Sequence, residues 1–275
     1  MIVRVLSYNI RYGGVAREAA LAAVVRAAAP DVVMLQEASV PTVVAALAEA
    51  AAMPHWGARE RHSTAFLSRL PVAHHAWHHP VGSRHAFLEV ALAGVDCRLF
   101  GLHLRAWFSR WSERRRAREL RALLRGIRAH QHGMHVIAGD FNALAPGERL
   151  HVGRFPAWIQ AMIWLSGRDI ARETIQLLLD EGYVDAWRLR HPDEPGVTFP
   201  TWDPHVRLDY LFAPEREAHR LRGCAVLRAP AEVRDASDHF PLLVELALEP
   251  RPSAGDAPDA AAGDVATDAR ARTHA

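Results

Sequence analysis

Short, mainly apolar runs that end in a polar side chain recur along this chain, and they constrain its fold most. The run 2–8 leads into Asn9, and the run 32–36 leads into Glu37. Runs of this length, rich in β-branched residues, are typical of buried strands. His103, Asp140 and Asn142 also follow such runs, whereas Asp209 lies within one and Asp238 and His239 stand just before the run 241–248. Because strand ends meet loops at the rim of a sheet, we expect these side chains to converge on one cleft.

The order of the expected elements favours a layered α/β protein with two packed mixed β-sheets. Four consecutive strands are expected at 64–69, 72–79, 85–92 and 95–102. Neighbouring strands with no helix between them argue against a purely parallel βαβ sheet. Helices are expected at 15–29, 41–52, 111–130 and 155–182, and further strands at 2–9, 31–36, 134–138, 184–187, 206–212, 223–228 and 241–248.

Length and composition place the chain among globular proteins. Its 275 residues, half of them apolar, can form one large core or two small domains. We expect a single catalytic domain over 1–250 and a disordered tail, rich in Ala, Asp, Pro and Gly, over 251–275. No apolar run reaches the roughly 18 residues of a membrane span, and no leader precedes the first run. We therefore expect a cytoplasmic monomer with no obligate protein partner.

Charge and cysteine content exclude two classes of function. The net charge of +2 is too small for a strongly basic nucleic-acid binder, so any attraction for phosphate must be local. Cys97 and Cys224 are the only cysteines, and both lie in apolar runs, which is typical of buried free thiols. Without a C-x-x-C pair, a thiolate zinc site is excluded.

The carboxylates and amides at the run ends each have a functional and a structural interpretation. Glu37 and Asp238 suit Mg²⁺, which prefers one or two carboxylates together with water and phosphate oxygens. Taken singly, either one is more typical of a surface or turn residue. Asp140 and Asn142 can orient water and donate to a phosphoryl oxygen, or can form an Asx turn. Asn9 is either a structural bridge or a donor in the site.

The histidines have the same two interpretations. His103 lies between two leucines and, taken alone, is typical of a core histidine. Asp209 lies among apolar residues and therefore needs a partner. A histidine is the useful partner, because a carboxylate on one ring nitrogen fixes the tautomer of the other. We expect this histidine to be His239.

The order and context of these residues together resemble the endonuclease/exonuclease/phosphatase superfamily over residues 1–248. The motifs that carry the resemblance are S-Y-N-I, L-Q-E, G-L-H-L, G-D-F-N, R-L-D-Y-L-F and S-D-H-F. The resemblance implies a four-layer sandwich of two packed mixed sheets flanked by helices. It also implies hydrolysis of phosphoesters with Mg²⁺ or Mn²⁺.

By resemblance, each motif residue takes a role. Glu37 and Asp238 look like metal ligands, and Asp209 looks like the partner of a general base, His239. Asn9 looks like the amide that helps to position Asp140 and the phosphate. His103 looks like a phosphate contact or an acid. Asp140 and Asn142 look like the pair that positions the nucleophile.

The chain also departs from the abasic endonucleases of this superfamily. Those enzymes usually have an acidic residue two positions after the first Asn, where this chain has Arg11, and tend to have Tyr where this chain has His103. Both differences count against abasic DNA as substrate. Arg11 is expected to face substrate phosphate instead. Arg105 and Trp202, in segments expected on the substrate side, complete the candidate binding residues.

Three further segments carry weaker signals. The Arg-rich helix at 111–130 is typical of a solvated face, or of a rim that attracts phosphate. The histidines between 74 and 85 are expected on the surface of a strand. The apolar segment 158–165 is expected to pack on a sheet, with contact to lipid as the alternative.

These observations predict a metal-dependent phosphodiesterase that acts on nucleic acid or on a phospholipid headgroup. A phosphomonoesterase of the same fold is the alternative, and a non-catalytic binding module is the third. The binding module is disfavoured because every candidate catalytic position holds a competent side chain.

Overall fold

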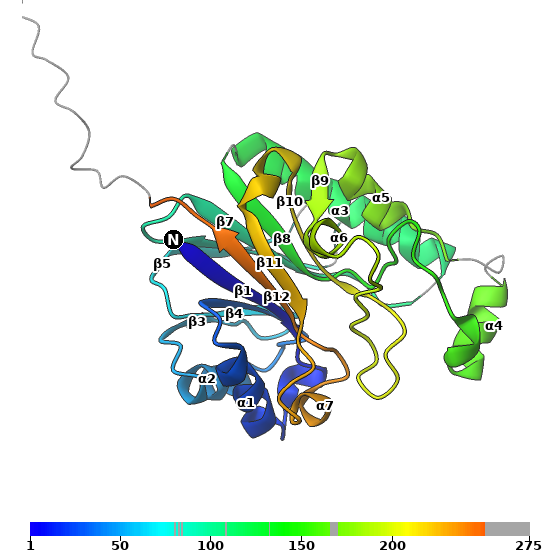
Figure 1. The fold of residues 1–275 in the computed structure, drawn as a ribbon, viewed down its shortest axis with the longest axis horizontal. Coiled ribbons are helices and arrows are strands. Elements are labelled where there is room, and N and C mark those ends of the chain that lie inside the picture. Colours follow the sequence, from blue (N-terminus) through cyan, green and yellow to red (C-terminus); the bar gives the residue numbers. More distant parts are fainter. Residues whose placement is uncertain are drawn as a thin grey trace, which may run out of the picture.

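Two six-stranded β-sheets pack face to face in the computed structural model of this chain, with helices outside them (Figure 1). The structure describes residues 1–79, 81, 83, 85–107, 109–131, 133–165 and 170–250. The expected disordered tail, 251–275, lies outside the described residues. The two mixed sheets and their flanking helices confirm the sandwich expected from the sequence.

The first sheet has the strand order β11-β12-β1-β2-β4-β3. β1 pairs in parallel with β2 and antiparallel with β12. Its strands are β1 (Ile2–Asn9), β2 (Val32–Gln36), β3 (His55–Gly57), β4 (Thr64–Ser68), β11 (Leu221–Val226) and β12 (Leu242–Ala247). The first and last strands of the described chain thus lie side by side.

The second sheet has the order β5-β6-β7-β8-β10-β9. β7 pairs in parallel with β8, and β10 pairs antiparallel with β8 on the other side. Its strands are β5 (Val72–His78), β6 (Phe87–Leu92), β7 (Cys97–His103), β8 (Met134–Asp140), β9 (Tyr183–Asp185) and β10 (Asp209–Pro214). Each sheet therefore combines one parallel pair with antiparallel neighbours.

Helices cover the outer face of each sheet. α1 (Glu18–Ala28), α2 (Pro41–Ala50) and α7 (Val233–Ala236) contribute to a core cluster with the outward side chains of the first sheet. α3 (Arg110–His130) and α5 (Glu173–Asp180) do the same for the second sheet. In α3, the buried residues Leu120, Leu124 and Ile127 recur at helical spacing and so form one apolar face.

The remaining helices are short. They are α4 (Ala157–Leu165), α6 (Ala186–Arg190) and the 3₁₀ turns η1 (Tyr12–Gly14), η2 (Val152–Arg154) and η3 (Glu215–Arg220). α6 corrects one prediction, since a strand was expected at 184–187 but the chain turns into a helix after Asp185. The Asp185 side chain accepts hydrogen bonds from the backbone N–H groups of Trp187 and Arg188, which caps the helix.

Other boundaries also differ from the expected ones. The helical segment expected at 155–182 consists of α4 and α5, and residues 166–169 between them lie outside the described residues. The strand expected from 206 begins only at Asp209. The three-residue strand β3 and the four-residue helix α7 were not expected, because elements this short leave almost no periodicity in a sequence.

The core between the sheets consists of side chains from the inner face of both. Val5, Met34 and Val244 come from the first sheet, and Val136 and Leu211 from the second. Cys97 and Cys224 are buried in the same core and are free thiols, as expected. Within the described ranges, no helix combines the length and apolarity needed to cross a membrane.

A glycine next to the end of β8 allows β7 and β8 to approach closely. Gly139 has φ of 151°, and a Cβ there would lie 1.9 Å from the carbonyl oxygen of Leu102. We predict that Gly139→Ala lowers the free energy of unfolding by about 3 kcal/mol or more, because backbone must move to relieve the clash. Urea unfolding followed by circular dichroism measures the change.

The matched control is Gly126→Ala in α3, where a Cβ meets no atom within 4 Å. Alanine in a helix is favoured over glycine, so this variant should gain about 0.5–1 kcal/mol. Equal stabilities for the two variants would contradict the packing described for β7 and β8.

Candidate active site

The strand directions bring the polar run ends to one edge of the sandwich. β1 and β2 are parallel, so Asn9 and Glu37 lie at the same end of the first sheet. β7 and β8 are also parallel, and their last residues, His103 and Asp140, are paired in register. β10 runs antiparallel to β8, so its first residue, Asp209, pairs with Asp140 from the other side. Across three neighbouring strands, Asp140 therefore lies between the imidazole of His103 and the carboxylate of Asp209.

The inward direction of these side chains follows from strand alternation. In β8, Val136 and Ala138 belong to the core between the sheets, and Asp140 continues the same face. In β10, Leu211 belongs to that core, and Asp209 shares its face. The candidate site is thus the last layer of the inter-sheet core, with polar side chains in place of apolar ones.

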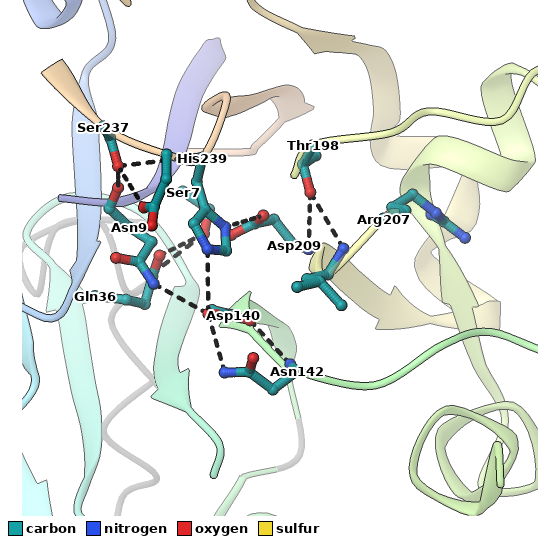
Figure 2. A network of polar contacts seen from close by, with 12 residues as sticks. Ser7, Asn9, Gln36, Asp140, Asn142, Thr198, Arg207, Asp209, Ser237 and His239 are labelled. Carbon is teal, nitrogen blue, oxygen red and sulfur yellow. Dashed lines mark hydrogen bonds and ion pairs between the residues drawn. The ribbon is translucent and has the colours of Figure 1, made fainter. Parts of the chain in front are cut away.

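The Asp140 carboxylate is the centre of the hydrogen-bond network (Figure 2). Nδ2 of Asn9, from the first sheet, donates to Oδ2 of Asp140 at 3.0 Å. The backbone N–H of Asn142 donates to Oδ1 at 2.9 Å, and its side-chain amide donates to Oδ2 at 3.1 Å. Asn142 has φ of 48°, a left-handed conformation that asparagine adopts more readily than most residues. The Asx turn and the functional arrangement therefore coexist.

His239 and Asp209 form a buried pair beside this carboxylate. Nδ1 of His239 lies 2.8 Å from Oδ2 of Asp209. Nε2, on the other side of the ring, lies 3.9 Å from Oδ2 of Asp140. Because Nδ1–H donates to Asp209, the ring presents Nε2 toward Asp140. The partner expected for Asp209 from the sequence is the one found.

Three neighbouring side chains fix this pair in place. The Ser237 hydroxyl donates to the backbone oxygen of Asn9 at 2.6 Å and accepts from the backbone N–H of His239 at 3.2 Å. The Thr198 hydroxyl accepts from the backbone N–H of Asp209 at 3.4 Å. The Phe199 ring lies against His239, with 4.8 Å between ring centroids. The loop before β12 is thereby tied to β1 and β10.

His103 approaches the same oxygen of Asp140 from the opposite strand. Its Nε2 lies 3.8 Å from Oδ2 of Asp140. Burial lowers the pKa of His103 to about 4, although Glu37 opposes the shift. The ring is therefore neutral near pH 7. Its Nδ1 is buried and makes no hydrogen bond to any described residue.

Burial and neighbouring charges also shift the other two titratable groups. Burial raises the pKa of Asp140 to about 7, and Asp209 adds to this rise while His239 opposes it. Burial alone would lower the pKa of His239, but Asp209, Asp140 and Asp238 outweigh it and raise the pKa to about 10. Asp140 and His239 thus hold their protons more tightly than the free side chains, which is typical of functional sites.

Glu37 reaches the network through a left-handed backbone. Its φ is 55°, an uncommon conformation for a residue other than glycine. Oε1 accepts from Nδ2 of Asn9 at 3.2 Å, and Oε2 accepts from the backbone N–H of Tyr12 at 2.6 Å. Asn9 therefore bridges the carboxylates of Glu37 and Asp140.

Asp238 lies opposite a cationic side chain. Its Oδ2 is 3.4 Å from Nε of Arg11, so the guanidinium expected to face phosphate here pairs with an expected metal ligand. No set of three or more His, Cys, Asp or Glu side chains in the described ranges is arranged to hold a metal ion. Glu37 and Asp238 supply two hard oxygen ligands, which fits Mg²⁺ because that ion keeps several waters and takes substrate oxygens.

The other expected binding residues lie on the rim. Trp202 is 63% exposed, and its ring lies 6.0 Å from the Arg11 guanidinium. Arg105, two residues after His103, stacks over Trp111 of α3 at 5.1 Å. These residues surround the buried network and do not contact Asp140 through any hydrogen bond in the structure as described.

A fully buried arginine holds the rim segment that carries Arg105. Nη1 of Arg116 donates to the backbone oxygens of Arg105 and Trp107, both at 2.8 Å. Nη2 lies 2.6 Å from the Glu113 carboxylate, which also accepts from the backbone N–H of Thr174 at 2.7 Å. All arginines of this helix were expected on its solvated face or on a phosphate-attracting rim, but Arg116 is fully buried, which corrects that prediction. The Glu113–Arg116 spacing of three was the available signal.

The family model described as "Endonuclease/Exonuclease/phosphatase family" matches residues 6–239 of this chain. A search of curated proteins gave no match. The match covers most strands of both packed sheets and the helices that flank them. The chain belongs to the endonuclease/exonuclease/phosphatase family.

Solved structures with the same fold include enzymes that act on DNA. A 3′ phosphatase from Neisseria, bound to a product DNA hairpin, has 19% identity and a TM-score of 0.69, with 89% of this chain and 99% of that chain covered. An AP endonuclease from Archaeoglobus fulgidus has 18% identity and a TM-score of 0.68, with 88% and 98% covered. An endonuclease/exonuclease/phosphatase from Beutenbergia cavernae has 21% identity and a TM-score of 0.62, with 90% and 72% covered.

The buried Arg116 allows a test of the rim. We predict that Arg116→Met lowers the free energy of unfolding by about 3–5 kcal/mol, because Glu113 keeps a buried charge without its partner. The double variant Glu113→Gln/Arg116→Met removes both charges and should be markedly more stable than Arg116→Met. Chemical denaturation of the three proteins measures this, and a double variant no more stable than the single one would contradict the pairing.

Proposed function

We propose that this chain hydrolyses a phosphodiester by in-line attack of water, with Mg²⁺ or Mn²⁺ as its cofactor. The observation that carries the proposal is that two amides and two imidazoles surround a single carboxylate oxygen, Oδ2 of Asp140. Oδ2 of Asp140 accepts from Asn9 and Asn142 and faces Nε2 of both His103 and His239. Two proton carriers and two amide donors around one carboxylate suit water attack on phosphorus.

The proton of the attacking water passes to the unit formed by Asp140, His239 and Asp209. Oδ2 of Asp140 can receive it directly, whereas Nε2 of His239, 3.9 Å away, can receive it only once the pKa of that ring, about 10 in this structure, has been lowered. Asp209 holds the ring orientation and stabilises the protonated imidazole. The neutral ring of His103 lies across Asp140 and donates its N–H to a phosphoryl oxygen, while the leaving group takes its proton from Asp140 or from water.

The Glu37 and Asp238 carboxylates hold the cation. When bound there, it would neutralise charge on the phosphoryl oxygens and lower the pKa of the nearby His239. The side-chain amides of Asn9 and Asn142 add donors for the same oxygens without adding charge. Arg11, which pairs with Asp238 at 3.4 Å, can exchange this carboxylate for substrate phosphate.

Two substrate classes are compatible with the rim. Nucleic acid is supported by the names of two similar structures, the 3′ phosphatase bound to a DNA hairpin and the AP endonuclease. It is also supported by the pairing of Arg11 with the exposed Trp202, since aromatic and Arg side chains stack with bases. A phospholipid headgroup is supported by the exposed apolar side chains of α4.

A substrate panel tests the reaction. We predict turnover of bis(p-nitrophenyl) phosphate with Mg²⁺ or Mn²⁺, loss of turnover in EDTA, and recovery when the metal is restored. Plasmid DNA, RNA, sphingomyelin, a phosphoinositide and p-nitrophenyl phosphate complete the panel and separate nucleic acid, lipid and monoester activity. Undiminished turnover in EDTA, or no turnover of any ester, would contradict the proposal.

Variants separate proton transfer from metal binding. We predict that His239→Ala and Asp209→Asn lower kcat by about 10²–10⁴-fold at saturating Mg²⁺, because they remove or misorient a proton carrier. Asp238→Ala should instead raise the Mg²⁺ concentration needed for half-maximal rate. Asp180→Asn, on the exposed side of α5, is the matched control and should keep the normal rate. Full turnover of His239→Ala at saturating Mg²⁺ would exclude its assigned role.

A further inference from the structure

α4 is apolar on the side that faces solvent as well as on the side that packs on the protein. Its nine residues, A-W-I-Q-A-M-I-W-L, include no charged side chain. Ile159, Met162 and Ile163 pack on a core cluster of the chain. On the opposite side, Trp158 is 57%, Trp164 60% and Leu165 78% exposed. A helix on a globular protein normally has a polar outer face, whereas the outer face of this one exposes large apolar side chains.

The exposed side of α4 continues onto the rim of the candidate active site. The Trp107 ring contacts the Trp158 ring edge to face, with 5.5 Å between centroids. Trp107 is 51% and Trp111 61% exposed, and both follow the His103 strand. We call Trp107, Trp111, Trp158, Trp164 and Leu165 the tryptophan surface. Figure 1 shows α4 at the periphery, apart from the two sheets.

Positive charge borders the tryptophan surface. Arg105 and Arg115 lie over the Trp111 ring at 5.1 and 5.5 Å, and Arg110 and Arg114 are exposed on the first turns of α3. The described residues of 104–118 include a single acid, Glu113, which is buried against Arg116. The described residues of 149–165 include none. Within these two described segments the exposed charges are therefore positive, although Arg154, just before α4, pairs with Asp203.

We propose that the tryptophan surface docks the enzyme onto an anionic lipid surface. Tryptophan and leucine enter the boundary between headgroups and acyl chains, and the bordering arginines meet the headgroup phosphates. At nine residues, α4 is far too short to span the bilayer, so it lies in the interface.

Two other occupants fit the surface less well. In a twofold dimer the surface would meet its own copy, which would place Arg110 and Arg114 against the same cationic border. A nucleic acid would find phosphate partners only among the bordering arginines and would leave the apolar part unused. The outer side of α4 offers Ala157, Trp158, Ala161, Trp164 and Leu165, none of which can neutralise a phosphate. A lipid surface uses the apolar and the cationic parts together.

The proposal places the active site toward the lipid. The cluster that α4 packs on includes Leu208, next to Asp209, and Phe199, whose ring lies against His239. A chain bound through α4 therefore has the cluster that lies next to His239 and Asp209 on the side of the lipid. Docking itself needs no hydrolysis, so it can be measured apart from the proposed reaction.

Vesicle sedimentation of the full chain in EDTA tests the docking. Vesicles of phosphatidylcholine alone are compared with vesicles that also contain phosphatidylserine. We predict binding that is stronger to the anionic vesicles and weakens as salt is added. Trp164→Gln/Leu165→Gln should weaken binding by about tenfold or more, because the inserted apolar area is lost. Trp56→Gln, on the exposed edge strand β3, is the matched control and should bind normally.

Charge is tested with a second pair of variants. Arg110→Gln/Arg114→Gln should weaken binding to the anionic vesicles by roughly 30-fold and leave binding to phosphatidylcholine little changed. Arg222→Gln, exposed on β11 of the other sheet, is the control. Wild-type chain that stays in the supernatant with both vesicles would overturn the proposal. Normal vesicle binding by Trp164→Gln/Leu165→Gln would also overturn it. The same holds if this variant binds vesicles normally but no longer forms a dimer, or no longer binds single-stranded DNA.

Discussion

The hydrogen bond between Asn9 and Asp140 joins the two sheets at the point where their apolar core ends. Nδ2 of Asn9, on β1, donates to Oδ2 of Asp140, on β8, at 3.0 Å. Both residues are buried, so neither polar group could be left unpaired without a large desolvation cost. Asn9 satisfies the carboxylates of Asp140 and Glu37 together. The same hydrogen bonds of Asn9 thus fix the distance between the sheets and bring the carboxylates of the candidate site together.

Strand alternation decides which residues can take part. A side chain reaches the site only if it continues the inward face of its strand, as Asp140 does after Val136 and Ala138. Moving any of these strands by one residue would turn its functional side chain to the helices outside. This is why Gly139 matters, since its lack of a Cβ lets β7 and β8 stay close at the register that pairs His103 with Asp140.

The sequence predicted the parts that depend on strand ends and missed those that depend on tertiary contacts. Asp209 among apolar residues required a partner, and His239 is beside it. Nothing local marked Arg116 as buried among surface arginines, because its burial depends on the Arg105–Trp107 backbone folding over it. Likewise, Arg11 was expected to face phosphate, yet its contact with Asp238 arises only when the η1 turn meets the loop before β12. The Thr198 hydroxyl supports the Asp209 backbone from a loop 11 residues earlier, and no periodicity in the sequence marks that contact.

The apolar cluster beneath α4 also lies next to the proposed catalytic pair, His239 and Asp209. Phe199 packs against His239 and belongs with Leu208 to the cluster beneath α4. The rim at Arg105 is held separately, by Arg116 and Glu113. Trp158 and Leu165, on the outer side of α4, take no part in the hydrogen-bond network that the described residues form around Asp140, so substituting them would test the proposed docking without removing a residue of the proposed proton-transfer unit.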